Sequence, residues 1–332
     1  MKRIPSLDGV RAIAILMVMW GHWAEVRFDS SIAGAYASLG RRIFFVLSGY
    51  LITTLLMKEL DKTSTIGLRR FYARRAYRIL PAAILFMLAV LVIFWHELRW
   101  YHMAAAALYL VNYDFAHPWY LGHLWSLSVQ EQFYFVWPVV LKKWYRHRLR
   151  IVVGAIGVAP LFRVVCHLLG MHGRADEFFP AVADILAIGC LLAFYSKGMP
   201  RIRAGWASAM MLPVVLVPVY MGLLHFHTTP VLLLFLWPLM HFSIAGLLFH
   251  VVQRAYWILN VGPVVWLGKI SYGLYLWQQI FAFGERPRPW YFPLFAVAAA
   301  SASYYLLEQP MIRLRENRVK RSLTIKVIAA AA

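Results

Sequence analysis

The sequence predicts an all-α, polytopic membrane protein with about ten transmembrane helices and both termini in the cytoplasm. Two observations lead to this fold class. Apolar segments long enough to cross a bilayer recur along the chain, and basic residues collect in the short stretches between them. Of the 332 residues, 62% are hydrophobic and only 14% are charged, whereas soluble domains carry about 25% charged residues. This composition excludes an ordinary soluble protein.

Ten apolar segments are each expected to form one membrane helix. They cover residues 11–26, 43–58, 79–95, 119–141, 151–169, 181–196, 206–223, 231–250, 264–283 and 290–307. The first segment has no convincing cleavage site after it, so we expect it to be retained as a helix. Residues 101–111 are apolar but too short to cross, and they are expected to be re-entrant or interfacial.

The basic residues predict the orientation of these helices. With ten crossings, the loops 58–78 and 142–150 and the C-terminal tail fall on one side, which the positive-inside rule assigns to the cytoplasm. Arg41 and Arg42 fall on the other side and depart from this pattern. We expect a single membrane domain over residues 1–315, a basic cytoplasmic tail over residues 316–332, and a place in the cytoplasmic membrane.

The formal net charge of +20 would indicate nucleic acid as a partner in a soluble protein. Here the basic runs coincide with membrane loops, so no nucleic acid is expected, and a pocket for an anionic cytoplasmic ligand is the more attractive second use of the charge. Cys166 and Cys190 lie in apolar runs without the spacing of a zinc or redox site. We expect neither a metal site nor a disulfide.

Ionisable residues inside the apolar segments are the main functional signal. Each costs roughly 2.5–3.5 kcal/mol at the centre of a membrane helix, so it tends to face the protein interior and to mark function. Arg11 and His22 bracket the stretch RAIAILMVMWGH; eleven positions place them on one helix face, about 16 Å apart. Asp8 can pair with Arg11. The pair fits an interfacial anchor and a packing histidine, or a site whose histidine accepts a proton.

The run RRFYARRAYRILP places Arg75 and Arg78 one turn apart, just before the segment 79–95. Pro81 is compatible with the first turn of the expected helix. The two arginines are either ordinary charges of the inner surface or an anion clamp, because guanidinium groups form forked, charge-assisted hydrogen bonds to phosphates.

Carboxylates in three further segments need partners. In WSLSVQEQFYF, Ser128, Glu131 and Tyr134 are spaced one turn apart and could face the bundle interior together. Because a buried carboxylate is costly without a partner, Glu131 is expected to meet an arginine, a histidine or polar hydrogens. Asp184 and Glu308 raise the same expectation, and all of these groups could equally form a structural polar network.

Small and aromatic residues mark two other segments. Gly40, Ser48 and Gly49 in GRRIFFVLSGYLIT could let helices approach closely. KISYGLYLWQQ places Tyr275 and Gln278 in one apolar segment, where aromatic residues are also common as interface anchors.

Six of these motifs, in this order, resemble the acyltransferase-3 family of integral membrane O-acyltransferases. The resemblance extends from Ser6 to about Arg315 and rests on SLDGVRAIAIL with the following His, FFVLSGYLIT, RRAYRILP, WSLSVQEQFY, LGKISYGLYLW and YYLLEQP. Each motif alone is weak, whereas six in the right order are specific. The family often has a histidine where this chain has Gln278, and its members are often less basic at Arg41 and Arg42.

The resemblance implies transfer of an acyl group, often acetyl, from cytoplasmic acyl-CoA to a hydroxyl of a glycan, a lipid or a small molecule at the membrane. Acyl-CoA would be a substrate, and no permanently bound cofactor is expected. Some members carry an additional extracytoplasmic domain, which we do not expect in a chain that stops soon after the last apolar segment. The alternative is a transporter or flippase of an acylated or anionic small molecule, for which internal repeats would be more typical.

Combining the motifs with the resemblance, we assign expected roles. His22 is the general base, Arg11 holds the donor or the site geometry, and Glu131 orients another group of the site. Arg75 and Arg78 are expected to bind the phosphates of acyl-CoA. The supporting residues are Ser48, Ser128, Tyr134, Asp184, Tyr275 and Glu308.

Overall fold

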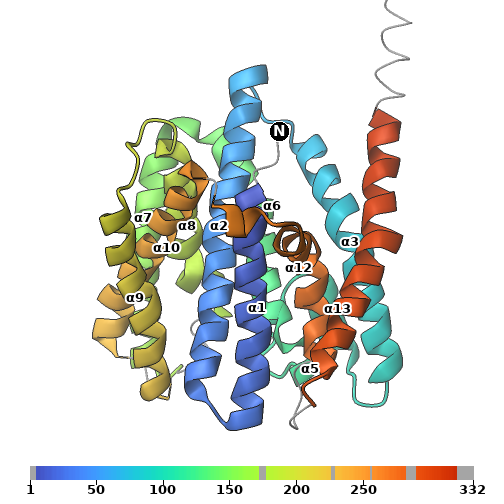
Figure 1. Ribbon diagram of the computed structural model, residues 1–332. Helices are drawn as coiled ribbons and strands as arrows, with labels where there is room; N and C mark the ends of the chain where they lie inside the picture. Colours follow the sequence, from blue (N-terminus) through green and yellow to red (C-terminus); the bar gives the residue numbers. More distant parts are fainter. Residues whose placement is uncertain (1–4, 172–176, 226–228, 255, 282–288, 320–332) are drawn as a thin grey trace, which may run out of the picture.

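The computed structural model describes residues 5–171, 177–225, 229–254, 256–281 and 289–319, and within these ranges the chain is helical with no β-strand. Figure 1 shows the long helices side by side along one common direction, with α1 and α2 in the centre. The all-α class is therefore confirmed.

The α-helices fall in the following order along the chain. They are α1 (Pro5–Phe28), α2 (Ser31–Thr63), α3 (Leu68–Ile93), α4 (Trp100–Ala107), α5 (Trp119–Gly122), α6 (Leu124–Lys143), α7 (Arg148–Leu168), α8 (Phe179–Tyr195), α9 (Ala204–Leu223), α10 (Trp237–Gln253), α11 (Trp257–Asn260), α12 (Gly262–Phe281) and α13 (Phe292–Ser303). Short 3₁₀ turns cover Val111–Tyr113 and Tyr145–His147. Single π-helical turns cover Leu232–Leu236, before α10, and Tyr304–Glu308, after α13.

Each of the ten predicted segments overlaps a helix of the structure. Within the described residues, five helices are long and apolar enough to cross a membrane on their own: Ser31–Thr63, Leu68–Ile93, Tyr145–Leu168, Ala204–Leu223 and Leu232–Gln253. The protein is thus consistent with a multi-pass membrane protein, while the count of ten crossings and the cytoplasmic termini stay predictions. Residues 282–283 of the ninth segment and residues 320–332 of the tail lie outside the described residues.

Two local expectations can be compared directly with the structure. The segment 101–111 contains only the eight-residue helix α4 and a 3₁₀ turn, which confirms that it is too short to cross. The expectation that Pro81 lies in the first turn of a helix is wrong, because α3 starts at Leu68 and Pro81 lies in its interior. Proline is tolerated inside membrane helices, where neighbouring groups can satisfy the backbone carbonyl that it leaves without a partner.

Small residues let the central helix α2 approach its neighbours closely, as the sequence predicts. A Cβ atom on Gly40 would lie 2.8 Å from a methyl group of Val18 on α1, and one on Gly49 would collide with the carbonyl of Leu186 on α8. The contact is reciprocal, because a Cβ atom on Gly189 of α8 would lie 2.8 Å from the Tyr50 nitrogen. Backbone-to-backbone contact of this kind is the usual basis of helix association in membranes.

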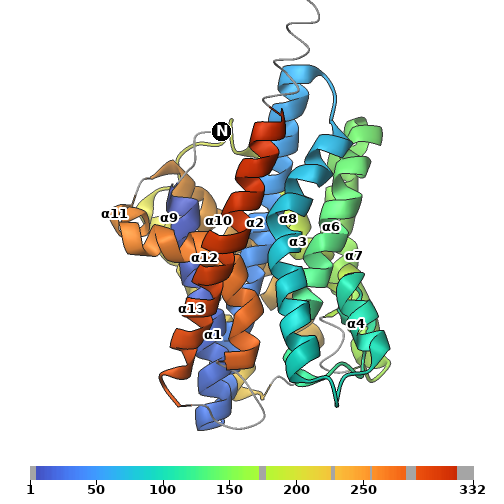
Figure 2. The same ribbon diagram turned by 90° about the vertical axis from the view of Figure 1, so that its right-hand side faces the viewer.

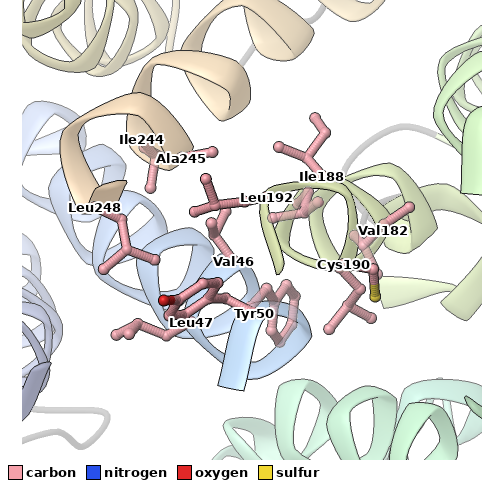
Figure 3. Packing of buried hydrophobic residues seen from close by; sticks show 14 of the residues in the cluster. Val46, Leu47, Tyr50, Val182, Ile188, Cys190, Leu192, Ile244, Ala245 and Leu248 are labelled. Carbon is pink, nitrogen blue, oxygen red and sulfur yellow. The ribbon is translucent and has the colours of Figure 1, made fainter. Parts of the chain in front are cut away.

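Two clusters of buried apolar side chains pack around the central helices α1 and α2. The first joins α2 to α8 and α10, where Leu47, Ile188 and Leu248 are among the buried side chains that Figure 3 shows. The second joins α1, α3, α6 and α12, and includes Phe86 and Leu274. Figure 2 shows α3 and α6 of this second cluster next to each other. Helices of the second cluster, together with α2, surround the candidate site described below.

Replacing Gly189 with alanine should destabilise the protein, because the added methyl group has no room between α8 and α2. Overpacking of this kind typically costs about 1–3 kcal/mol, which should appear as a lower thermal unfolding midpoint of the detergent-solubilised protein. Gly157→Ala on α7 is the matched control, because a Cβ atom there meets nothing within 4 Å. Equal unfolding midpoints for the two variants would contradict the proposed close approach of α2 and α8.

Candidate active site

A cavity of about 280 Å³ lies between α1, α2, α3, α6 and α12. Its lining carries four arginines and one carboxylate, contributed by Arg11, Arg41, Arg75, Arg78 and Glu131. Along α2 the lining runs from Arg41 to Leu55, a distance of about 21 Å at the rise of an α-helix. The cavity is therefore elongated and rich in positive charge.

One end of the cavity carries the three arginines that the sequence singled out. Figure 1 places the start of α1, the start of α3 and the end of α2 at the same end of the bundle. Arg11 forms an ion pair of 2.8 Å with Asp8, as predicted. Arg75 forms an ion pair of 2.7 Å with Glu131, and its guanidinium lies 3.4 Å from the centre of the Tyr134 ring. Glu131 is expected from the sequence to meet an arginine, a histidine or polar hydrogens, and Arg75 is the partner that the structure shows.

Arg78 differs from its neighbours because it makes no ion pair within 4 Å with any residue that the structure describes. Its side chain is exposed to the cavity, and Glu308 is close enough for the two charges to interact. An unpaired guanidinium beside two paired ones leaves this end of the cavity with an excess of positive charge, which favours an anionic ligand.

Hydroxyl groups and aromatic rings line the other end of the cavity. The Tyr275 hydroxyl donates to the carbonyl of His123 over 2.9 Å and lies beside the hydroxyl of Ser126. Nearer the arginine end, the Tyr272 hydroxyl donates to the carbonyl of Ile79 and ties α12 to α3. These bonds fix the spacing of the three helices around the cavity.

His22 lies directly behind this second end of the cavity and does not line it. Its Nε2 atom is 3.1 Å from a guanidinium nitrogen of Arg41, and its Nδ1 atom is 3.2 Å from the side-chain oxygen of Gln278. His22 and the cavity are thus separated by the side chain of Arg41.

Several buried polar atoms on α12 and at the start of α6 lack hydrogen-bond partners among the described residues. They include both ring nitrogens of His123, the indole nitrogen of Trp277 and the side-chain nitrogen of Gln278. The ring of His123 lies 5.5 Å from that of Tyr275, centre to centre. Unsatisfied buried polar atoms are uncommon in folded proteins, and a substrate with hydroxyl groups is one way of satisfying them.

The structure brings together most of the residues proposed from the sequence. Of these, Arg11, Ser48, Arg75, Arg78, Glu131, Tyr134 and Tyr275 line the cavity. His22 is one hydrogen bond away from it, and Glu308 lies near Arg78. Ser128, in contrast, is buried and bonds back to the carbonyl of Leu124 within its own helix.

Asp184 lies in a separate, fully buried network. Arg163 forms two hydrogen bonds of 2.9 Å with its carboxylate, and the Nδ1 atom of His241 lies 3.1 Å from one carboxylate oxygen. Arg42 completes the network by donating to the Nε2 atom of His241 over 2.8 Å, with its guanidinium 3.9 Å from the centre of the Trp237 ring. The network joins α2, α7, α8 and α10, because each of these helices contributes one of its four side chains. None of the four lines the cavity.

Sequence reasoning missed the contact of Arg41 with His22, and it also missed Ser126 and His123. For Arg41 a signal was present, because Arg41 and Ser48 are seven residues apart and therefore lie on the same face of α2. The helical spacing of Glu131 and Tyr134 favours Ser128 as their neighbour and gives no signal for Ser126. No local pattern marks His123, whose position depends on how α6 meets α12.

These observations define a helical membrane protein with an arginine-lined cavity, and the comparison with known proteins places it in a family. A family model described as an acyltransferase domain matches residues 4–316, and the chain therefore belongs to the acyltransferase-3 family. This confirms the resemblance drawn from the motifs.

Two relatives illustrate the similarity. Peptidoglycan O-acetyltransferase OatA of Listeria monocytogenes is 28% identical over 321 residues, which cover 83% of this chain and 49% of the relative. O-acetyltransferase OatA of Staphylococcus aureus is 32% identical over 215 residues, covering 58% of this chain and 35% of the relative. The chain thus spans about half the length of the first of these relatives. No solved structure shows a significant match.

Removing Arg75 alone should destabilise the protein more than removing the pair that it forms with Glu131. Arg75→Met leaves a largely buried carboxylate without its partner, which costs up to about 3 kcal/mol. Thermal unfolding of Arg75→Met, Glu131→Gln and the double variant should therefore show a favourable coupling between the two side chains. The exposed pair Lys197–Asp61, with side chains 74% and 48% exposed, is the control and should show almost no coupling. Strictly additive losses at Arg75 and Glu131 would contradict a stabilising pair.

Proposed function

We propose that the protein is a membrane-embedded acyltransferase that moves an acyl group, most simply acetyl, from cytoplasmic acyl-CoA to a hydroxyl of a glycan or glycolipid. The observation that carries this proposal is the elongated, arginine-lined cavity whose far end is one hydrogen bond from His22. Family membership and the names of the relatives support the same reaction class.

The cavity fits the chemistry of the donor. Coenzyme A has a highly charged nucleotide end and a long, thin, mostly uncharged arm that ends in the thioester. Arg78, Arg11 and Arg75 would hold the phosphates at the end of the bundle that the basic loops predict to be cytoplasmic. The arm would follow the apolar side chains of α2, such as Leu51 and Phe44, and bring the thioester to Ser126, Tyr275 and Arg41.

His22 would act as the general base in the transfer step. The acceptor hydroxyl gives its proton to the imidazole while its oxygen attacks the thioester carbon. The carbon–sulfur bond then breaks, and the departing thiolate takes the proton back from the imidazolium, so that the products are an ester and free coenzyme A. No metal or bound cofactor enters this sequence.

The acceptor would approach His22 from the side of the unsatisfied polar atoms. His123, Trp277 and Gln278 offer hydrogen-bonding atoms there that no described residue occupies. A polyhydroxylated acceptor such as a saccharide could bond to them, in agreement with the peptidoglycan acceptor in the name of the Listeria relative.

His22→Gln should abolish detectable transfer, because glutamine cannot accept the proton; general-base assistance contributes about 10²–10⁴-fold. The measurement is transfer of radiolabelled acetyl from acetyl-CoA to glycan fragments by the purified protein in proteoliposomes, with thermal unfolding as the check on folding. Wild-type rates in a folded His22→Gln protein would show that His22 is not the base. A wild-type protein that carries acetyl-CoA or an acylated product across the membrane without any transfer would favour the transporter alternative.

Arg78→Met should weaken acetyl-CoA binding at least tenfold, because a hydrogen bond to a charged group contributes about 1.5–3 kcal/mol. Its binding should also depend less on salt than that of the wild type, since one cationic contact is lost. Titration of the purified protein with acetyl-CoA at two ionic strengths measures both effects. Arg69→Met, an exposed arginine on the same helix outside the cavity, is the matched control and should bind normally. Equal affinities for the two variants would exclude phosphate binding by Arg78.

A further inference from the structure

The two hydrogen bonds of His22 define which ring nitrogen carries the proton. A guanidinium group can only donate hydrogen bonds, so the Nε2 atom that faces Arg41 must be the acceptor. The Nδ1 atom then carries the hydrogen and donates it to the side-chain oxygen of Gln278. The histidine is therefore neutral, with its basic lone pair directed at Arg41.

Arg41 donates this hydrogen bond and also lines the cavity. It lines the cavity together with Ser126 and Tyr275, whereas His22 does not. Its guanidinium also lies 5.5 Å from the centre of the Trp125 ring. Arg41 lines the cavity and contacts the candidate base, whereas Arg11 is paired with Asp8 and Arg75 with Glu131.

The neighbouring arginine provides an internal comparison. Arg42 binds the Nε2 atom of His241 in the same manner, and the Nδ1 atom of His241 faces Asp184. That arrangement is closed off, since Arg42 is 4% and His241 0% exposed, and neither lines the cavity. Two consecutive residues of α2 thus form the same contact with a histidine, but only that of Arg41 borders a space that a substrate can enter.

We propose that Arg41 is a second catalytic residue, whose guanidinium exchanges the Nε2 atom of His22 for the thioester oxygen during the transfer step. This inference rests on the proposed acyl transfer. The move has two consequences for the reaction. It stabilises the negative charge that develops on the carbonyl oxygen, and it releases the lone pair of Nε2 for the acceptor hydroxyl.

The reaction step remains balanced with Arg41 included. As the acceptor oxygen bonds to the carbonyl carbon, its proton passes to Nε2 and the electron pair of the carbonyl moves to the oxygen that Arg41 binds. When the carbonyl re-forms, the carbon–sulfur bond breaks and the thiolate recovers the proton from Nε2. Arg41 keeps its own protons throughout, as expected of a guanidinium group.

Kinetics of Arg41→Met test the electrostatic role. Loss of one hydrogen-bond donor to a developing oxyanion costs about 10²–10³-fold in kcat, whereas the affinity for acetyl-CoA should change less than threefold because Arg41 is remote from the phosphate end. Arg41→Lys should recover part of kcat, and thermal unfolding checks the fold of both variants. Unchanged kcat in Arg41→Met, or a loss of donor affinity as large as the loss of kcat, would overturn the proposal. Absence of transfer by the wild type would instead refute the proposed function.

Nitrogen NMR of histidine-labelled protein tests the hydrogen bonds independently of activity. The His22 signals are identified by difference from His22→Gln, and they should report a neutral ring with the hydrogen on Nδ1. A ketone analogue of acetyl-CoA, with a methylene between carbonyl and sulfur, should shift the Nε2 signal in the wild type and leave the corresponding signal unshifted in Arg41→Met. A hydrogen on Nε2, or an unshifted signal in wild type with the analogue bound, would overturn the proposed movement of Arg41.

Discussion

The structure depends on one constraint: every charged side chain within an apolar helical bundle needs a partner, since burying an unpaired charge is far more costly than burying any apolar group. The pair between Arg75 and Glu131 meets this requirement across α3 and α6. The network around Asp184 meets it across α2, α7, α8 and α10. These pairs decide which helix faces turn toward one another, and the apolar clusters then fill the space around them.

The cavity exists because this pairing is incomplete at one place. Its lining has more arginines than carboxylates, and among the described residues Arg78 has no ion pair within 4 Å, although Glu308 lies close enough to interact with it. In a soluble protein, water would solvate such an excess at little cost. Between membrane helices that excess is costly, and the proposed anionic donor would supply the missing negative charge.

Arg41 and Arg42 are adjacent on α2 but have different surroundings. Adjacent residues on an α-helix point about 100° apart, so Arg42 faces the closed network of His241 while Arg41 faces the cavity and His22. The predicted topology puts both on the side of the membrane where few basic residues are expected. Only the positions of α1, α10 and α12 around α2 tell which of the two can meet a substrate.

The sequence by itself determined the all-α class, the approximate positions of the helices, the close approach at Gly40 and Gly49, the pair Asp8–Arg11, and the need of Glu131 for a polar partner. These follow from hydrophobic length, helical spacing and the cost of a buried charge, all of which act over a few turns of one helix. The tertiary structure decided that Asp184 belongs to a separate network, that α3 continues through Pro81, and that His22 lies behind Arg41. His22 is 19 residues from Arg41 and 256 from Gln278 in the chain, and contacts over such separations depend on how whole helices pack, which no local pattern records.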